Sequence, residues 1–327
     1  ENLKGLRVNI WEEIKHPISP FADIAAVFRL AKYFKDNKID VVNTHSSKAG
    51  ILGRLAARLA GVKKVVHTVH GFSFHEYQNP AAHLFFVMIE SFFAGVTSKF
   101  VAVGKDVADY GIKKGVGTRD KYIVIRPGID VNAFKHGISQ AKKQKFLSKY
   151  GLDRDKFTVV MIGNCKKQKN PMGFAAVACL ALEKIPDMQF IFAGDGPLKA
   201  KAEKYVAERG FSGKVKFIGW TDEPDVLIKS SDLFLLTSLW EGIPCALAQA
   251  AAAGLPIIAS DIAGNREFMS AIGAKKFLYP ALDYSAAAAL IGGIYTGKMK
   301  YKASPNEIVA EFDSEKMTRQ YEVLFKE

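Results

Sequence analysis

The chain of 327 residues is poor in cysteine and lacks long apolar runs. Its three cysteines form no CxxC pair and leave one unpaired, so a disulfide framework is not expected and a reducing cytosol fits. No apolar run reaches the roughly 18 residues that a membrane span needs, since the most apolar stretch, 81–97, contains a histidine and a glutamate. The length predicts two domains, and 49% apolar with 24% charged residues is an ordinary globular composition.

Acidic residues are scarce in the first half of the chain. Residues 1–150 carry 24 Lys and Arg against 12 Asp and Glu, whereas residues 151–327 carry 22 against 21. This excess predicts an anionic partner for the first half, either lipid headgroups, a phosphorylated acceptor or nucleic acid; a well-solvated basic surface is the alternative. Nucleic acid is the least expected partner, because basic and aromatic residues are not interleaved and no DNA-reading motif occurs. No signal-peptide pattern follows Glu1.

Short β-type runs alternate with helical patterns along the chain. Strands are expected at 39–44, 65–69, 100–103, 122–125, 157–162, 190–193, 215–218, 233–236 and 256–259. Helical patterns lie between them and near the end, at 285–294 and 314–325, while the basic, weakly patterned stretch 135–155 is expected to be a linker. Alternating strands and helices predict parallel sheets covered on both faces, and two such series predict two Rossmann-like domains. In such a pair the site lies in the cleft, at the carboxyl ends of the strands.

Two of the expected helices carry large apolar side chains. Ser19 and Pro20 are an N-cap and a first helical residue, and Phe21, Ile24 and Phe28 then recur at helical spacing, which predicts an amphipathic helix. The helix 80–94 is expected to pack into a core, with insertion into a membrane interface as the alternative. Its large apolar residues are Phe85, Phe86, Met88, Ile89, Phe92 and Phe93.

The most informative segment is the loop 163–171, which follows a strand and opens a helix. Gly163 allows a close approach of the backbone to a ligand, and free N–H groups at the helix start attract anions. Lys166, Lys167 and Lys169 add cationic donors, so a phosphate or diphosphate is the expected ligand. The loop is neither a Walker A nor a GxGxxG motif, and an exposed basic loop is the alternative.

Further polar residues follow other expected strands. Glu241 is placed to accept hydrogen bonds from sugar or ribose hydroxyls, unless it merely caps the helix after it. Gly194-Asp195-Gly196-Pro197 is a tight turn. His70 ends a strand in the basic half, where a structural role is the alternative to a functional one, and a second polar cluster, 45–48, ends the strand before it.

With these motifs in this order, the chain resembles the retaining glycosyltransferases of family 4, or group 1, over nearly its whole length. The matching segments are 42–60, 67–72, 128–130 with Phe134, 163–170, 194–198, 231–235, 241–244, and 254–261 with Gly264 and Glu267. The resemblance implies the GT-B fold, with two Rossmann-like domains that face a cleft. It implies an acceptor-side domain over 1–136, a nucleotide-sugar domain over 137–312, and a C-terminal helix, 313–327, that packs back on the first domain.

The resemblance also implies roles for single residues. Lys169 would bind the donor diphosphate, Glu241 would face the transferred sugar, and His70 would lie near the reacting sugar and the acceptor; these three are the expected catalytic residues. The expected donor-binding residues are Gly163, Asn164, Lys166, Lys167, Lys169, Gly194, Gly196, Glu241, Gly242, Ile243, Pro244 and Gln249. The expected acceptor-side residues are His45, Ser47, Lys48, His70 and Gly71.

The chain departs from the family pattern at three places. The second Glu of the family's Glu–x7–Glu signature is Gln249, which can still bond ribose hydroxyls but without a charge. Asn164 stands where the family has Arg, and neighbouring lysines offer no bidentate fork in its place. The family's first strand and Gly-rich loop have no counterpart, so the first domain is expected to lack its N-terminal strand, either because the sequence omits an upstream piece or because the chain is truncated.

The resemblance predicts retaining transfer of a hexose from a nucleotide diphosphate sugar, with UDP expected, to a polysaccharide or lipid-linked glycan. Neither a cofactor nor a metal is expected, and Asp153-Arg154-Asp155 precedes a strand and is rejected as a metal site. The basic half fits a polyprenyl-diphosphate-linked acceptor, and the expected location is the cytoplasm, including the inner face of a bacterial membrane. The alternatives are a nucleotide-sugar epimerase or hydrolase of the same fold, and a non-catalytic nucleotide-sugar-binding module.

Overall fold

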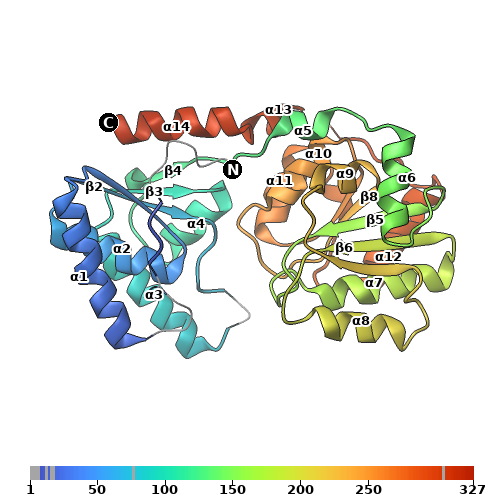
Figure 1. Cartoon of the computed structure of the whole chain (residues 1–327), viewed down its shortest axis with the longest axis horizontal. Coiled ribbons are helices and arrows are strands. Elements are labelled where there is room, and N and C mark those ends of the chain that lie inside the picture. The colour runs from blue at the N-terminus through green and yellow to red at the C-terminus, as the bar shows by residue number, and fades with distance from the viewer. Residues whose placement is uncertain (1–7, 12–13, 15–18, 76–77, 304–305) are drawn as a thin grey trace. The chain divides into compact units, whose positions relative to one another are not determined.

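The structure is a computed structural model that describes residues 8–11, 14, 19–75, 78–303 and 306–327. Its contacts divide the chain into two compact units: Glu1–Ile125 with Val323–Glu327, and Arg126–Glu322. Each unit contains one parallel sheet with helices packed around it (Figure 1). The predicted α/β architecture with two parallel-sheet domains is therefore confirmed, while the boundary expected at residue 136 stays a prediction about the domains of the whole protein.

The first unit holds a four-stranded sheet in the order β1-β2-β3-β4. Its strands are β1 (Val41–His45), β2 (Lys64–Val69), β3 (Lys99–Ala102) and β4 (Tyr122–Val124). Its helices are α1 (Pro20–Asp36), α2 (Ser47–Ala60), α3 (Pro80–Ala94), α4 (Lys105–Lys113) and the short η1 (Arg119–Lys121). Beneath the sheet, a fully buried ion pair links α2 to α3, because Arg54 lies 2.7 Å from Glu90.

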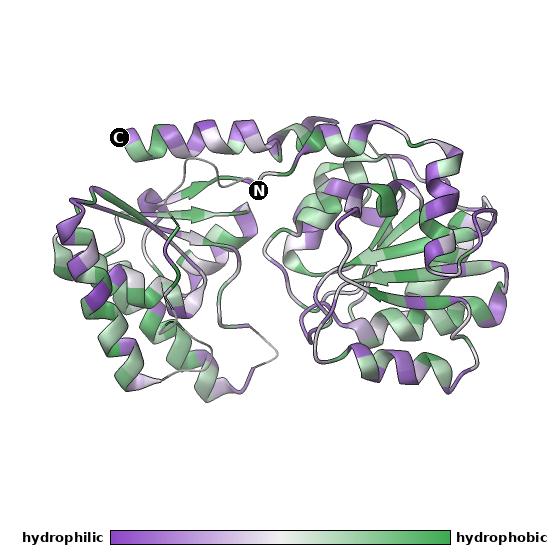
Figure 2. Cartoon of the chain, viewed as in Figure 1, coloured by the Kyte–Doolittle hydropathy of each residue, from purple (hydrophilic) through white to green (hydrophobic). Residues whose placement is uncertain are grey.

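The second unit holds a six-stranded parallel sheet in the order β10-β9-β8-β5-β6-β7. Its strands are β5 (Phe157–Ile162), β6 (Met188–Ala193), β7 (Val215–Gly219), β8 (Leu233–Leu236), β9 (Ile257–Ser260) and β10 (Leu278–Tyr279). The central strands are almost wholly apolar (Figure 2), as expected for a parallel sheet that is covered on both faces.

The helices of this unit lie between and after these strands. They are α5 (Val131–Lys135), α6 (Gln140–Lys149), α7 (Pro171–Lys184), α8 (Lys199–Ala207), α9 (Pro224–Lys229), α10 (Cys245–Ala252), α11 (Ala263–Ala271), η2 (Lys275–Phe277), α12 (Tyr284–Tyr295), α13 (Asn306–Glu311) and α14 (Ser314–Lys326). The end of α14 groups with the first unit, where Lys64 Nζ donates a hydrogen bond to the Leu324 carbonyl oxygen.

One expectation about local structure is wrong, and one predicted helix forms with its large apolar residues exposed. The stretch 135–155 is not a mere linker, because it contains α6, whose Phe146 and Leu147 are buried in the core of the second unit. The helix α1 forms as predicted, but Phe21 is 90% exposed and Ile24 and Phe28 also face outward. The residues that α1 buries are small or paired, and they include Ala26 and Asp23.

The expectation that the helix 80–94 packs wholly into a core is wrong for one of its faces. Leu84, Phe85, Met88 and Phe92 of α3 are all more than half exposed, whereas Phe86 packs against the core of the first unit. Apart from the buried Glu90, α3 carries no charged residue, and it is green along most of its length in Figure 2. Among the described residues, no helix combines the length and the apolar character that crossing a bilayer demands.

Candidate active site

The candidate site lies where the strand order of the second sheet reverses. The strand β5 pairs with β6 on one side and with β8 on the other, and all three are parallel. In parallel α/β sheets, ligands bind beyond the carboxyl ends of the strands at such a switch point, here β5 and β8. The predicted loop 163–170 follows β5, and Glu241 follows β8, so the topology brings the two motifs to this one edge.

The loop after β5 is held by main-chain bonds to its neighbour. The amide of Gly163 donates to the Ala193 carbonyl, and Cys165 N donates to Asp195 O at 2.8 Å. A Cβ atom at Gly194, where φ is +143°, would lie 1.8 Å from Gly163 O, so only glycine fits this position. The glycines of the tight turn thus set the shape of the candidate phosphate loop.

A short ion pair joins the two predicted catalytic residues of this unit. Lys169 Nζ lies 2.5 Å from Glu241 Oε1, and the two side chains are only 16% and 7% exposed. Ser238 Oγ donates to the same carboxylate oxygen at 2.7 Å, and Gln168 Nε2 donates to Oε2 at 3.4 Å. The alternative that Glu241 caps the following helix is wrong, because α10 has Pro244 as its N-cap and no side-chain cap bond.

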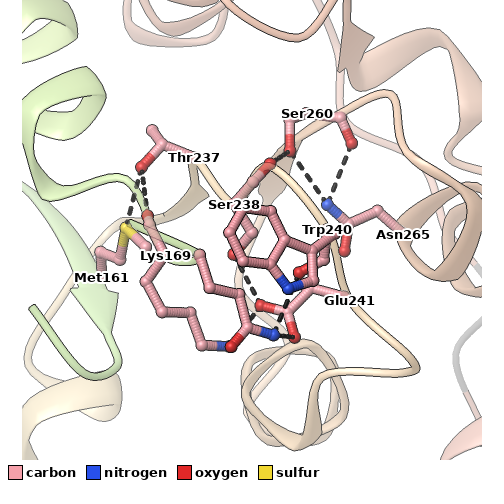
Figure 3. A network of polar contacts seen from close by, with 9 residues as sticks. Met161, Lys169, Thr237, Ser238, Trp240, Glu241, Ser260 and Asn265 are labelled. Atoms are coloured by element: carbon pink, nitrogen blue, oxygen red, sulfur yellow. Dashed lines mark hydrogen bonds and ion pairs between the residues drawn. The ribbon is translucent and has the colours of Figure 1, made fainter. Parts of the chain in front are cut away.

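Figure 3 shows how this pair is supported from β9 and α11. Ser260 Oγ donates to the Ser238 carbonyl at 2.5 Å, and the fully buried Asn265 donates from Nδ2 to Ser260 O at 2.9 Å. The Thr237 hydroxyl bonds the carbonyl oxygens of Lys169 and its neighbour Asn170. The chain of contacts therefore fixes Glu241 through groups in the loops that follow β5 and β8, at the end of β9 and on α11.

Sequence reasoning missed these supporting side chains. Ser238 and Ser260 each stand at or just beyond the end of a strand, and Asn265 lies between Gly264 and Glu267, two single residues that carried the family resemblance. The sequence could therefore indicate that the two serines lie at strand ends. It could not indicate their contacts, because the strand order decides which strand ends become neighbours.

The remaining predicted donor-binding residues are distributed along the same edge. Asn164, Lys166 and Lys167 are exposed, and Gln249 is half-buried on α10. The main chain of 242–244 is buried, and a Cβ atom at Gly264 would lie 1.6 Å from the Gly242 carbonyl oxygen. This edge of the sheet therefore has the exposed side chains of Lys166 and Lys167 and the tightly packed main chain of 242–244.

The predicted acceptor-side residues gather in the first unit, at the carboxyl ends of β1 and β2. His45 Nδ1 lies 2.9 Å from His70 Nε2, and Gly71 follows His70. Ser47 begins α2, and Lys48 lies 2.6 Å from Asp23, so the charge of that lysine is already balanced. Burial lowers the pKa of His70, and burial together with the neighbouring His70 lowers the pKa of His45.

The described parts of both units contain no group of three or more His, Cys, Asp or Glu that could hold a metal ion. Asp153 caps the turn between α6 and β5, since its Oδ1 accepts a hydrogen bond from the main-chain N–H of Asp155. The lysines of the loop 163–170 and the polar groups around Glu241 can bind an anion and hydroxyl groups.

Comparisons with known proteins agree with this geometry. Residues 142–306 match the model of the family "Glycosyl transferases group 1", and residues 6–133 match that of "Glycosyltransferase Family 4". The fold is that of UDP- and glucose-bound HepE from Anabaena, with a TM-score of 0.78 at 19% identity over 95% of this chain and 84% of that one. The two parallel-sheet domains are thus those of the GT-B fold, and the chain belongs to the group 1 glycosyltransferases.

Two relatives illustrate the family. An Escherichia coli protein, UDP-Gal:alpha-D-GlcNAc-diphosphoundecaprenol alpha-1,3-galactosyltransferase, is 39% identical over 252 residues, which are 76% of this chain and 64% of that protein. A Campylobacter jejuni protein, N,N'-diacetylbacillosaminyl-diphospho-undecaprenol alpha-1,3-N-acetylgalactosaminyltransferase, is 26% identical over 276 residues, which are 81% of this chain and 70% of that protein. The present chain therefore spans just under two thirds of the E. coli relative.

Proposed function

We propose that this protein transfers a hexose from a UDP-sugar to a lipid-linked glycan, with retention at the transferred carbon. The observation that carries the proposal is the ion pair of Lys169 and Glu241 at the switch point of the second sheet, in a chain that belongs to this family. The name of the E. coli relative supports a UDP-sugar donor. The names of both relatives support an acceptor that is built on undecaprenyl diphosphate.

In the proposed reaction the donor diphosphate lies over the loop 163–170. Lys169 binds it, with Lys166 and Lys167 nearby as exposed cations. The amides at the start of α7 contribute little, because Pro171 has no N–H and the Gly173 amide is already bonded to Asn170 Oδ1.

As the sugar leaves, negative charge develops on the β-phosphate, and the lysines of the loop stabilise it. Glu241 and the main chain of 242–244 face the sugar, and Gln249 bonds the ribose through its amide.

On the acceptor side we place His45, Ser47, Lys48, His70 and Gly71, with His70 nearest the reacting sugar. The leaving phosphate takes the proton of the acceptor hydroxyl. We propose no resident cofactor or metal, because the lysines supply the positive charge that the leaving group needs. The split of the chain into an acceptor-side domain over 1–136, a donor domain over 137–312 and a returning C-terminal helix belongs to this proposal.

We also propose that the first unit works at the cytoplasmic face of a membrane. The basic excess of residues 1–150 suits an anionic surface, and the exposed face of α3 supplies apolar side chains without a charge among them. A lipid-linked acceptor presents its sugars at that surface. The first unit would then contact the membrane surface without crossing the bilayer, beside the sugars of the acceptor.

The test is a transfer assay with the purified protein and short-chain polyprenyl-diphosphate-linked N-acetylglucosamine in detergent. UDP-galactose, UDP-glucose, UDP-N-acetylglucosamine and GDP-mannose are compared as donors, and product stereochemistry is read by NMR. One UDP-sugar should give an α-linked product, and Lys169→Ala should remove both UDP binding and transfer. The exposed Lys184→Ala, at the other end of α7, is the matched control, and it should change UDP affinity by less than about threefold because its charge is solvated and distant from the loop.

Three outcomes separate the alternatives. Binding of a UDP-sugar without transfer to any acceptor supports a nucleotide-sugar-binding module. Conversion of the sugar nucleotide without an acceptor supports an epimerase or hydrolase. Absence of nucleotide binding in the unmodified protein refutes the assignment of the loop 163–170.

A further inference from the structure

A residue with an unusual main-chain conformation follows the lysine of the candidate phosphate loop. Asn170 is the N-cap of α7, yet its φ and ψ are +52° and +60°, in the left-handed region. An N-cap residue ordinarily has an extended conformation, and a residue other than glycine rarely has a positive φ. Asn170 is also buried, with 9% of its surface exposed. The chain therefore turns through a sparsely populated conformation directly after Lys169.

This turn fixes the main chain of Lys169. The amides of Lys169 and Asn170 both donate to the Lys166 carbonyl oxygen at 3.1 Å. The Thr237 hydroxyl lies 3.1 Å from the carbonyl oxygen of Lys169 and 3.0 Å from that of Asn170. Thr237 directly follows β8, so the turn is anchored beside the segment that carries Glu241.

The side chain of Lys169 extends from this anchored main chain across Gly163. A Cβ atom at Gly163 would lie 3.1 Å from both Cγ and Cδ of Lys169, and 3.3 Å from its Cε. The stem of the lysine therefore lies along the bare backbone of Gly163, and its ammonium lies 2.5 Å from Glu241 Oε1 (Figure 3). Because this stem is long, a changed chain direction at residue 170 would move the ammonium away from the site.

The side chain of Asn170 holds the turn in place. Its Oδ1 accepts a hydrogen bond from the Gly173 amide at 3.0 Å, and its Nδ2 donates to the Tyr284 hydroxyl at 3.2 Å. A Cβ atom at Gly173 would lie 2.3 Å from Nδ2 of Asn170 and 2.9 Å from Cε1 of Tyr284, so only glycine leaves room for both bonds. The amide group of Asn170 is thus bonded on one side to α7 and on the other to the first residue of α12.

The turn that carries Tyr284 contains a second left-handed residue. Leu282, two positions before Tyr284, has φ +75°. Of the residues that the structure describes, four other than glycine have a positive φ, and Asn170 and Leu282 are two of them. The two therefore lie on either side of one hydrogen bond. Such conformations persist only where the surrounding structure holds them, and they cluster at functional sites.

We propose that Asn170 is a positioning residue whose left-handed conformation, held by the bond to Tyr284, directs Lys169 to the donor diphosphate. The inference rests on the proposed function for the identity of this ligand. It adds a requirement that concerns the main chain rather than the side chain of residue 170. Glycine adopts the left-handed region freely and should therefore replace Asn170, whereas serine, which caps helices well from an extended conformation, should not.

The binding test measures UDP affinity by calorimetry in whole-chain variants. Asn170→Gly should bind UDP within about threefold of the unmodified protein, while Asn170→Ser should bind it at least about tenfold more weakly, because serine must pay for the left-handed conformation. A role in helix capping alone predicts the reverse order, since serine is a better N-cap than glycine. Tyr284→Phe should weaken binding about threefold through loss of one hydrogen bond. The matched control is Asn132→Ala, at an exposed asparagine of α5, which should leave UDP affinity unchanged.

A second readout needs no ligand. Acetylation of Lys169 by acetic anhydride, measured by mass spectrometry against the exposed Lys184 of the same chain, reports whether the ammonium still lies in its 16% exposed place beside the carboxylate. The relative rate should rise at least about threefold in Asn170→Ser and stay constant in Asn170→Gly, because a displaced lysine gains access to solvent.

The two readouts separate the positioning role from the proposed function. If the unmodified protein binds no UDP, the proposed ligand is refuted, and the acetylation rates alone decide whether Asn170 positions Lys169. UDP affinity in Asn170→Gly that is no higher than in Asn170→Ser would overturn the positioning role. An unchanged acetylation rate of Lys169 in Asn170→Ser would overturn it as well, and unchanged UDP affinity in Tyr284→Phe would refute the part assigned to that hydroxyl.

Discussion

Replacement of Glu241 by Gln should affect UDP and the UDP-sugar in opposite directions. In the structure Lys169 Nζ lies 2.5 Å from Glu241 Oε1, so a diphosphate that recruits this lysine must compete with the carboxylate. Glu241→Gln keeps the length of the side chain and can still accept the hydroxyl of Ser238. It removes only the charge that holds Lys169.

The size of the effect follows from the burial of the pair. Two unit charges about 4 Å apart attract by about 4 kcal/mol at an effective dielectric constant of 20. Desolvation offsets part of this attraction, and a charged hydrogen bond contributes about 1.5–3 kcal/mol net. If UDP binding gives up about 1.4 kcal/mol less in the variant, its affinity for UDP rises about tenfold.

Transfer should change the other way. A carboxylate that faces the sugar and bonds it more strongly in the transition state cannot be replaced by an amide without loss, so kcat should fall at least about a hundredfold. Calorimetric titration of UDP and initial-rate assays on the same preparation measure the two effects, with Lys169→Ala as the variant that loses both. A tenfold or greater weakening of UDP binding in Glu241→Gln would refute the competition, because it would mean that the carboxylate positions Lys169 for the phosphate.

Three further predictions concern other parts of the molecule. Gly194→Ala should lower the thermal midpoint and abolish UDP binding, because its Cβ atom would clash with a main-chain oxygen. Gly210 has φ +76° with no atom within 4 Å of an added Cβ, so Gly210→Ala should lower the free energy of unfolding by only about 1 kcal/mol. Equal effects of the two changes in calorimetry would contradict this prediction. The double change Phe85→Ser and Phe92→Ser should reduce flotation with anionic liposomes at least about tenfold, since each exposed ring contributes about 1–2 kcal/mol on burial. Unaltered flotation would refute the proposal that the exposed face of α3 contacts the membrane. Gln249→Glu should tighten UDP binding about threefold to tenfold through a charged bond to the ribose, and titration of 2′,3′-dideoxy-UDP, which should show no gain, checks the cause.

The local structure around the site followed closely from the sequence. Buried strands at 157–162 and 233–236 were predicted with the bounds that β5 and β8 have. The loop before Asn170-Pro171 and the Glu-Gly-Ile-Pro segment were recognised from residue types that follow a strand and precede a helix. Such signals are local, because hydrophobic runs and helix-start residues act within a few positions of the chain.

Burial of the helices was harder to predict. The apolar spacing of α1 and α3 is genuine, yet Phe21 and Phe92 are 90% and 75% exposed. In α1 the contact with α2 uses small residues and a paired aspartate, and in α3 the buried carboxylate of Glu90 is bonded to Arg54. Periodicity identifies an apolar face but cannot tell which side of a helix the neighbouring elements will cover.

The sequence by itself determined the alternating strands and helices, the basic first half, the phosphate-type loop and the identity of the residues that follow each strand. Only the tertiary structure decided which of these residues meet. Lys169 and Glu241 are 72 positions apart and His45 and His70 are 25 apart, and each pair forms because two particular strands are parallel neighbours. Strand order depends on how all the helices and strands pack together, so no local pattern encodes it, and the site's chemistry depends on that order.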